Sequence, residues 1–172
     1  MLQLSKIFWN ICRLKSKPQD FPGRASLLLI VVLAGIVIDS FSSSILIPSL
    51  SGLEVVQIIV LYNLVLLASV YILLKLVGFA ERSIQTITAI AGSGLFISLV
   101  LLPALLVLNT ANEASKSFVL LILVDNIWRI SVNAHIFRHA LSINKLMAMI
   151  LSVSYLLLGF LVADILLQQQ AP

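Results

Sequence analysis

Six polar residues interrupt long apolar stretches of this sequence, and their side chains are the ones that could do chemistry. They comprise two acids, one arginine and three asparagines: Asp39, Asn63, Asp125, Asn126, Arg129 and Asn133. A charge at the centre of a bilayer costs roughly 2.5–3.5 kcal/mol on insertion scales, so such groups face the interior of a bundle and find partners there. Asp125 and Arg129 are four residues apart and share one face of a helix. We therefore expect a buried polar cluster in which Arg129 pairs with Asp125, with Asp39 or with both.

Small residues flank Asp39 at helical spacing. Gly35, Asp39 and Ser43 recur every four residues, and small side chains let helices approach closely. We expect this stripe to meet the helix that carries Arg129. Three interpretations of the polar cluster stay open: a structural clasp that fixes helix pairing, a path for protons or ions, and a surface matched by another subunit. The clasp is the leading interpretation.

No other set of residues indicates a chemical function. His135 and His139 are four residues apart, but the residues between them lack the glutamate of zinc peptidases and include Arg138. Cys12 is the single cysteine and cannot form an intramolecular disulfide, so we interpret it as an inert thiol near the membrane. We therefore predict that the chain is not an enzyme and that it has no cofactor and no metal site.

The composition predicts elements that belong in lipid. Of the 172 residues, 60% are hydrophobic and 10% are charged, whereas soluble domains carry about 25% charged residues. A helix needs about 20 apolar residues to cross a bilayer, and unpaired backbone groups cannot face lipid. We predict an all-α polytopic membrane protein, a bundle of five transmembrane helices joined by short linkers. The spans are predicted at residues 25–48, 54–77, 86–108, 117–138 and 145–167, followed by a short tail at 168–172.

Residues 1–24 are predicted to form a cytoplasmic amphipathic segment. Within it, Leu4, Phe8, Ile11 and Leu14 recur at helical spacing across residues 2–15. A helix of this kind can lie in the plane of the membrane interface, in contact with anionic headgroups. Prolines at 18 and 22 then turn the chain into the first span.

Basic residues set the orientation of the spans. Nearly all of them fall in segments that share one side when five spans alternate: Lys6, Arg13, Lys15, Lys17, Arg24, Lys75, Arg82, Arg138 and Lys145. The opposite loops contain only Lys116. Cytoplasmic loops carry the excess of lysine and arginine, so the N-terminus is predicted to be cytoplasmic and the C-terminus to lie on the far side. The net charge of +4 is thereby assigned to orientation and headgroups, not to nucleic acid.

The layout resembles the Yip1-type membrane domain family, with a cytoplasmic N-terminal segment, five closely spaced spans and a short tail. The region from Ile127-Trp128-Arg129-Ile130 through His139-Ala140-Leu141 to Tyr155-Leu156-Leu157-Leu158 is similar to the corresponding part of bacterial members, and so is the entry between Pro18 and Pro22. The resemblance implies an interaction or scaffold role within a membrane and transfers no catalytic residues.

Two functions follow from the sequence. The leading hypothesis is a non-enzymatic accessory or scaffold subunit of a bacterial inner membrane, in contact with other membrane proteins or with copies of itself. The alternative is a small transporter or channel with a proton or ion path through Asp39, Asp125 and Arg129.

Overall fold

The computed structural model describes the backbone of residues 2–110 and 114–169, and the side chains of residues 6–108 and 117–169. Within these ranges the chain is all-α. The six α-helices are α1 (Leu2–Cys12), α2 (Ala25–Leu46), α3 (Gly52–Leu76), α4 (Ser83–Thr110), α5 (Ala114–Ala140) and α6 (Lys145–Gln168), and the two short 3-10 helices are η1 (Pro18–Asp20) and η2 (Ala80–Arg82). Helices α2 to α6 are long and apolar enough to cross a membrane. The predicted all-α fold and the five long apolar helices are confirmed.

The ends of the helices follow from local chemistry. At the start of α3, Ser51 and Glu54 form a capping box, in which the Ser51 hydroxyl accepts from the Glu54 amide and the Glu54 carboxylate accepts from the Ser51 amide. Asn144 caps α6 by accepting from the Met147 amide at 2.8 Å. Gly78 has a φ of 84° directly after α3, a conformation in which glycine has no steric penalty. Both ends of α3 and the start of α6 are therefore marked by residues that suit the end of a helix.

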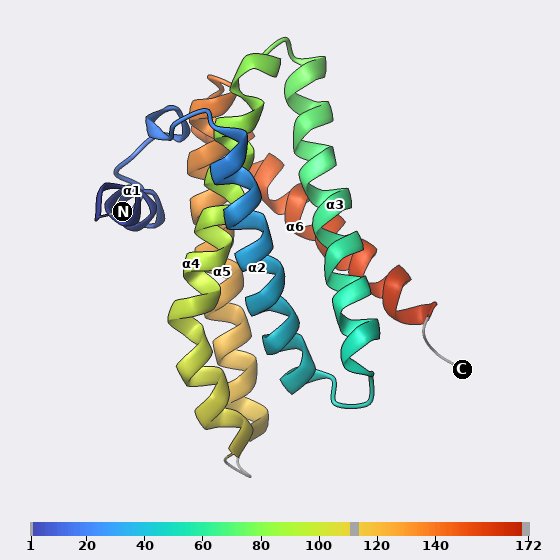
Figure 1. Cartoon of the computed structure of the whole chain (residues 1–172). Coiled ribbons are helices and arrows are strands. Elements are labelled where there is room, and N and C mark those ends of the chain that lie inside the picture. Colours follow the sequence, from blue (N-terminus) through green and yellow to red (C-terminus); the bar gives the residue numbers. More distant parts are fainter. Residues whose placement is uncertain (1, 111–113, 170–172) are drawn as a thin grey trace.

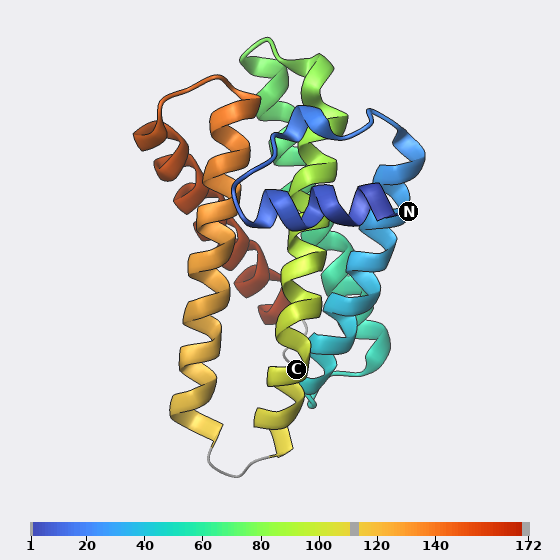
Figure 2. The same cartoon turned by 90° about the vertical axis from the view of Figure 1, so that its left-hand side faces the viewer.

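The five long helices alternate in direction and are joined by short connections (Figure 1). Helix α4 lies at the centre, with α2 on one side and α5 on the other, while α3 and α6 lie on the opposite face of α2 and α5. Helix α6 crosses the bundle obliquely in both views (Figures 1 and 2). We expected the Asp39 stripe of α2 to meet α5, and this expectation is wrong: α2 packs chiefly on α4, which separates it from α5.

Helix α1 lies across the side of the bundle, over α4 and beside α5 (Figure 2). Its buried face includes Ile11, which is completely covered, and Cys12. Phe8 packs into a notch at Gly92 of α4, where no side chain stands in its way. The predicted helix at 2–15 is therefore present but ends at Cys12, and the Leu4 side chain lies outside the described residues. Its amphipathic, interfacial character stays a prediction.

The packed core lies at the end of the bundle where the α3–α4 and α5–α6 connections are found. Its buried side chains come from all the long helices except α2 and from the N-terminal segment, and they include Phe21, Leu74, Ile87, Phe137 and Ala148. Most other apolar side chains on the long helices stay exposed in the isolated chain, Leu76 at 80%. The opposite end of the bundle is more open, because α6 leans away from α4 and α5 (Figure 1).

Candidate functional site: a polar cluster between two cavities

An ion pair on α5 forms the centre of the site. Arg129 Nε donates to both carboxylate oxygens of Asp125, at 2.8 Å and 2.9 Å. The two side chains are one helical turn apart, so the helix itself sets this geometry. They keep 31% and 28% of their surface because they line a cavity. The expected pairing of Arg129 with Asp125 is present, and a ligand in the cavity can reach both groups.

Ser98 of α4 connects this ion pair to Asp39 of α2. Arg129 Nη2 donates to Ser98 Oγ at 2.9 Å, and Ser98 Oγ donates to Asp39 Oδ1 at 3.0 Å. The expected contact between Arg129 and Asp39 is thus relayed through a hydroxyl, because α4 stands between the two helices that carry them. We call Asp39, Ser98, Asp125 and Arg129 the acid–arginine cluster. It joins three helices by hydrogen bonds that run in a single chain.

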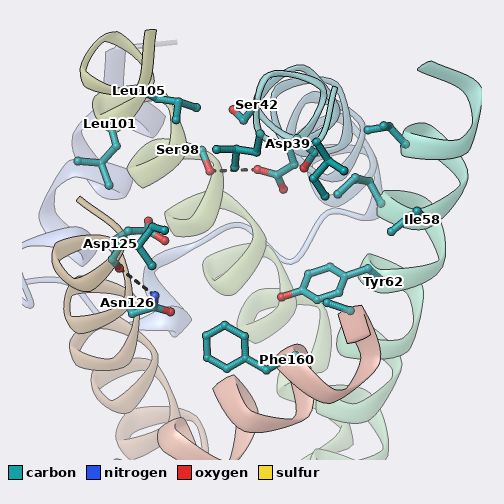
Figure 3. A pocket seen from close by; sticks show the side chains of 18 of the residues that line it. Asp39, Ser42, Ile58, Tyr62, Ser98, Leu101, Leu105, Asp125, Asn126 and Phe160 are labelled. Atoms are coloured by element: carbon teal, nitrogen blue, oxygen red, sulfur yellow. Dashed lines mark hydrogen bonds between the residues drawn. The ribbon is translucent and has the colours of Figure 1, made fainter. Parts of the chain in front are cut away.

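A cavity of about 450 Å³ opens beside the acid–arginine cluster. Its walls are mostly apolar and come from α2 to α6, and its polar floor includes Asp39, Ser98, Asp125 and Arg129. Figure 3 shows Asp39 and Tyr62 reaching toward the cavity from one side and Asp125 and Asn126 lying on the other. We call it the outer cavity, because the rest of its lining comes from the end of the bundle opposite the packed core.

A smaller cavity of about 100 Å³ lies on the other side of the cluster. We call it the inner cavity; Gly35, Ile90, Asn133 and Ser152 are among the residues that line it. Four residues line both cavities: Asp39, Tyr62, Arg129 and Leu156. The two spaces are therefore separated by a thin layer built from an acid, an arginine, a tyrosine and one apolar side chain.

The three asparagines of the predicted site take separate places. Asn126 lines the outer cavity and donates to the Ile122 carbonyl at 2.8 Å. Asn63 lines the inner cavity and donates to the Ile59 carbonyl at 3.0 Å. Asn133 also lines the inner cavity. All six predicted residues thus border at least one of the cavities, but the asparagines do not join the hydrogen-bonded chain of the acid–arginine cluster.

Two residues of the site were not in the predicted set. Ser98 was visible only as one of several small residues on its helix, and Tyr62 only as an aromatic residue in an apolar span. The Tyr62 hydroxyl lies against Gly159 of α6, where an added Cβ would stand 2.9 Å from that oxygen. A serine or tyrosine carries no charge that would mark it as costly in lipid, so its role depends on which helices meet.

Both histidines of α5 contact the N-terminal segment. His135 Nε2 lies 2.8 Å from the Ser16 carbonyl, and the His139 carbonyl accepts from Gln19 at 2.9 Å. Trp128 Nε1 donates to the Cys12 carbonyl at 3.1 Å. Within the described part of the chain, no three histidine, cysteine or acidic side chains are grouped closely enough to hold a metal ion. These contacts fasten residues 12–19 to α5.

The comparisons identify no relative. No family model, no curated protein and no solved structure matches this chain. The resemblance to the Yip1-type membrane domain therefore stays a prediction.

Proposed function

We propose that this chain is a five-span integral membrane protein with a cytoplasmic N-terminus and a C-terminus on the other side. Two observations support this: the five long apolar helices, and the basic residues Arg24, Lys75, Arg82, Arg138 and Lys145 at the end of the bundle that holds the packed core. Lysine and arginine favour the cytoplasmic side. A bacterial inner membrane stays the predicted location.

We further propose that the protein is a small transporter in which protons or a small cation pass through the acid–arginine cluster. The observation that carries this proposal is the pair of cavities that share Asp39, Tyr62 and Arg129 as a common wall. Ionisable residues within spans line substrate and ion pathways in many membrane proteins. A clasp that served only to hold helices together would be expected to be enclosed by packing, whereas here a cavity reaches the cluster from each side.

The arrangement gives each group a defined task. The guanidinium of Arg129 carries a permanent positive charge and donates two hydrogen bonds to the Asp125 carboxylate. Among the described residues, Asp39 receives a side-chain hydrogen bond only at Oδ1, from the neutral Ser98 hydroxyl. Asp39 is therefore the acid we assign to exchange a proton or cation between the two cavities. Ser98 positions it against Arg129.

Flux in sealed proteoliposomes tests the transport proposal. Proton entry is followed with an internal dye, under a pH gradient alone and with a lipophilic cation on the opposite side. We expect wild-type vesicles to exceed empty vesicles in at least one of these conditions and Asp39→Asn vesicles to match empty ones. Asp164→Asn is the matched control, because Asp164 is an exposed acid of α6 that contacts Gln168 and lines neither cavity. Wild-type vesicles that match empty ones in both conditions would refute transport.

An accessory-subunit role is the second candidate, and α5 is the feature that favours it. This helix is the least apolar of the five long helices, and its candidate membrane-crossing stretch has a smaller buried share than those of the other four. The partner would be another membrane protein whose span covers α5. Leu120→Trp on α5 should then reduce a complex isolated in mild detergent, while Leu64→Trp on α3, equally exposed at 62%, should not. Equal recovery of the complex with both variants would contradict this role.

A further inference from the structure

The outer cavity contains one acid that is not neutralised by a cation. Among its described lining residues are two carboxylates, Asp39 and Asp125, and one guanidinium, Arg129. Arg129 directs Nε to both oxygens of Asp125 and Nη2 to the Ser98 hydroxyl. Within the described residues, Asp39 makes no ion pair. With all three groups ionised, the floor of the cavity therefore carries one excess negative charge, and that charge belongs to Asp39.

The rest of the cavity suits an apolar body. Its walls include Leu46, Ile58, Leu101 and Leu105, and Phe160 lies across the opening from the acids (Figure 3). A volume of about 450 Å³ falls within the range of sites for small organic ligands. Aromatic rings such as that of Phe160 also attract cations to their faces. The cavity thus has one negatively charged group at its floor and apolar walls around the rest of its volume.

We propose that the outer cavity binds a monovalent organic cation with an apolar body, of the tertiary or quaternary ammonium class, with its charged centre toward Asp39. This inference rests on the proposed function, because it names the ligand class of the same cavity. An anion is disfavoured because the Arg129 charge is already neutralised by Asp125. A neutral lipid chain would fill the walls but leave the Asp39 charge without a counterion in an apolar space.

Protons compete with the cation for this acid. Of the groups that face Asp39, the arginine carries a permanent charge and the tyrosine is neutral near pH 7. A proton on Asp39 removes the excess charge, and the affinity for a cation falls as the pH is lowered. The neighbours come from four helices, namely Arg129 and Asp125 of α5, Ser98 of α4, Tyr62 of α3 and Leu156 of α6.

Equilibrium dialysis of the full-length chain in detergent tests the inference with two probes of the same shape and opposite charge. Tetraphenylphosphonium is the cation and tetraphenylborate the anion, and protein-free micelles correct for partitioning. We expect the wild-type chain to bind the cation at least tenfold more tightly than the anion at pH 8. The affinity for the cation should weaken toward pH 5. Asp39→Asn should lose at least tenfold in cation affinity, and Asp164→Asn should bind as the wild type does.

The outcomes separate this inference from the transport proposal. Equal binding of both probes would identify an apolar cavity without charge selectivity and would overturn the inference, and so would an unchanged affinity in Asp39→Asn. The comparison of probes on the wild-type chain needs no substitution, so it holds even if the variant fails to fold. A chain that binds the cation without any flux would keep this inference and refute transport. Proton flux without selective cation binding would support transport and overturn this inference.

Discussion

Docking of α1 on the bundle depends on the absence of a side chain at Gly92. A Cβ added there would overlap the Phe8 ring and would stand 2.7 Å from two further ring atoms, Cδ1 and Cζ, whereas carbon atoms pack at about 3.5–4.0 Å. Gly92→Ala therefore forces α1 outward or Phe8 out of its notch. Inserting a methyl group into a packed contact of this kind costs about 1–3 kcal/mol.

Cys12 supplies the assay, because it is the single cysteine and lies beneath α1 at 5% exposure. Burial raises the pKa of the Cys12 thiol to about 12, from an ordinary value of 9.0. At pH 8 the thiolate fraction of the docked thiol is then roughly a thousandth of that of an exposed one. Labelling by a maleimide should accordingly proceed through the undocked state, and its rate reports how often α1 opens.

The expected result is a faster reaction of Gly92→Ala. A loss of about 1–3 kcal/mol in docking raises the undocked population roughly 5- to 150-fold, and the labelling rate should rise by the same factor. Gly35→Ala is the matched control: it also replaces a helical glycine by alanine, but an added Cβ meets nothing within 4 Å. If Gly92→Ala reacts at the wild-type rate, the packing of Phe8 into Gly92 does not hold α1 in place.

Three further predictions concern other contacts. Trp128→Phe removes the hydrogen bond to the Cys12 carbonyl. Because a bond of this kind is worth about 0.5–1.5 kcal/mol, the Cys12 labelling rate should rise roughly two- to tenfold. An unchanged rate would mean that the indole does not hold the N-terminal segment on α5. Ser98→Ala removes the hydroxyl that links Asp39 to Arg129. It should lower the free energy of unfolding in detergent by about 1.5–3 kcal/mol. A stability equal to that of the wild type would show that these two hydrogen bonds are not formed. Asn144→Ala removes the cap of α6 and should cost about 1 kcal/mol in the same measurement, with no change in Cys12 labelling because α6 does not hold α1.

The sequence was sufficient to predict the elements and much less informative about their arrangement. Each long helix satisfies its own backbone hydrogen bonds, so length and apolar composition predicted the five spans within a few residues of the observed helices. The ion pair between Asp125 and Arg129 was also predictable, since both residues lie on one helix and its geometry sets their separation. Asp39 was predicted to belong to the same polar cluster because a lone acid in an apolar span needs a partner.

The tertiary structure decided which helices meet, and therefore what the polar residues do. Nothing in the sequence placed α4 between α2 and α5. Ser98 as the bridge, Tyr62 as a shared wall and a cavity on each side of the cluster were therefore not predictable. The physical reason is that these helices are apolar on most faces. In a bilayer, the lipid tails are as apolar as the helix interior, so the hydrophobic pattern does not mark which face turns inward. Close packing and a few hydrogen bonds between distant parts of the chain make that choice, and they exist only once the chain has folded.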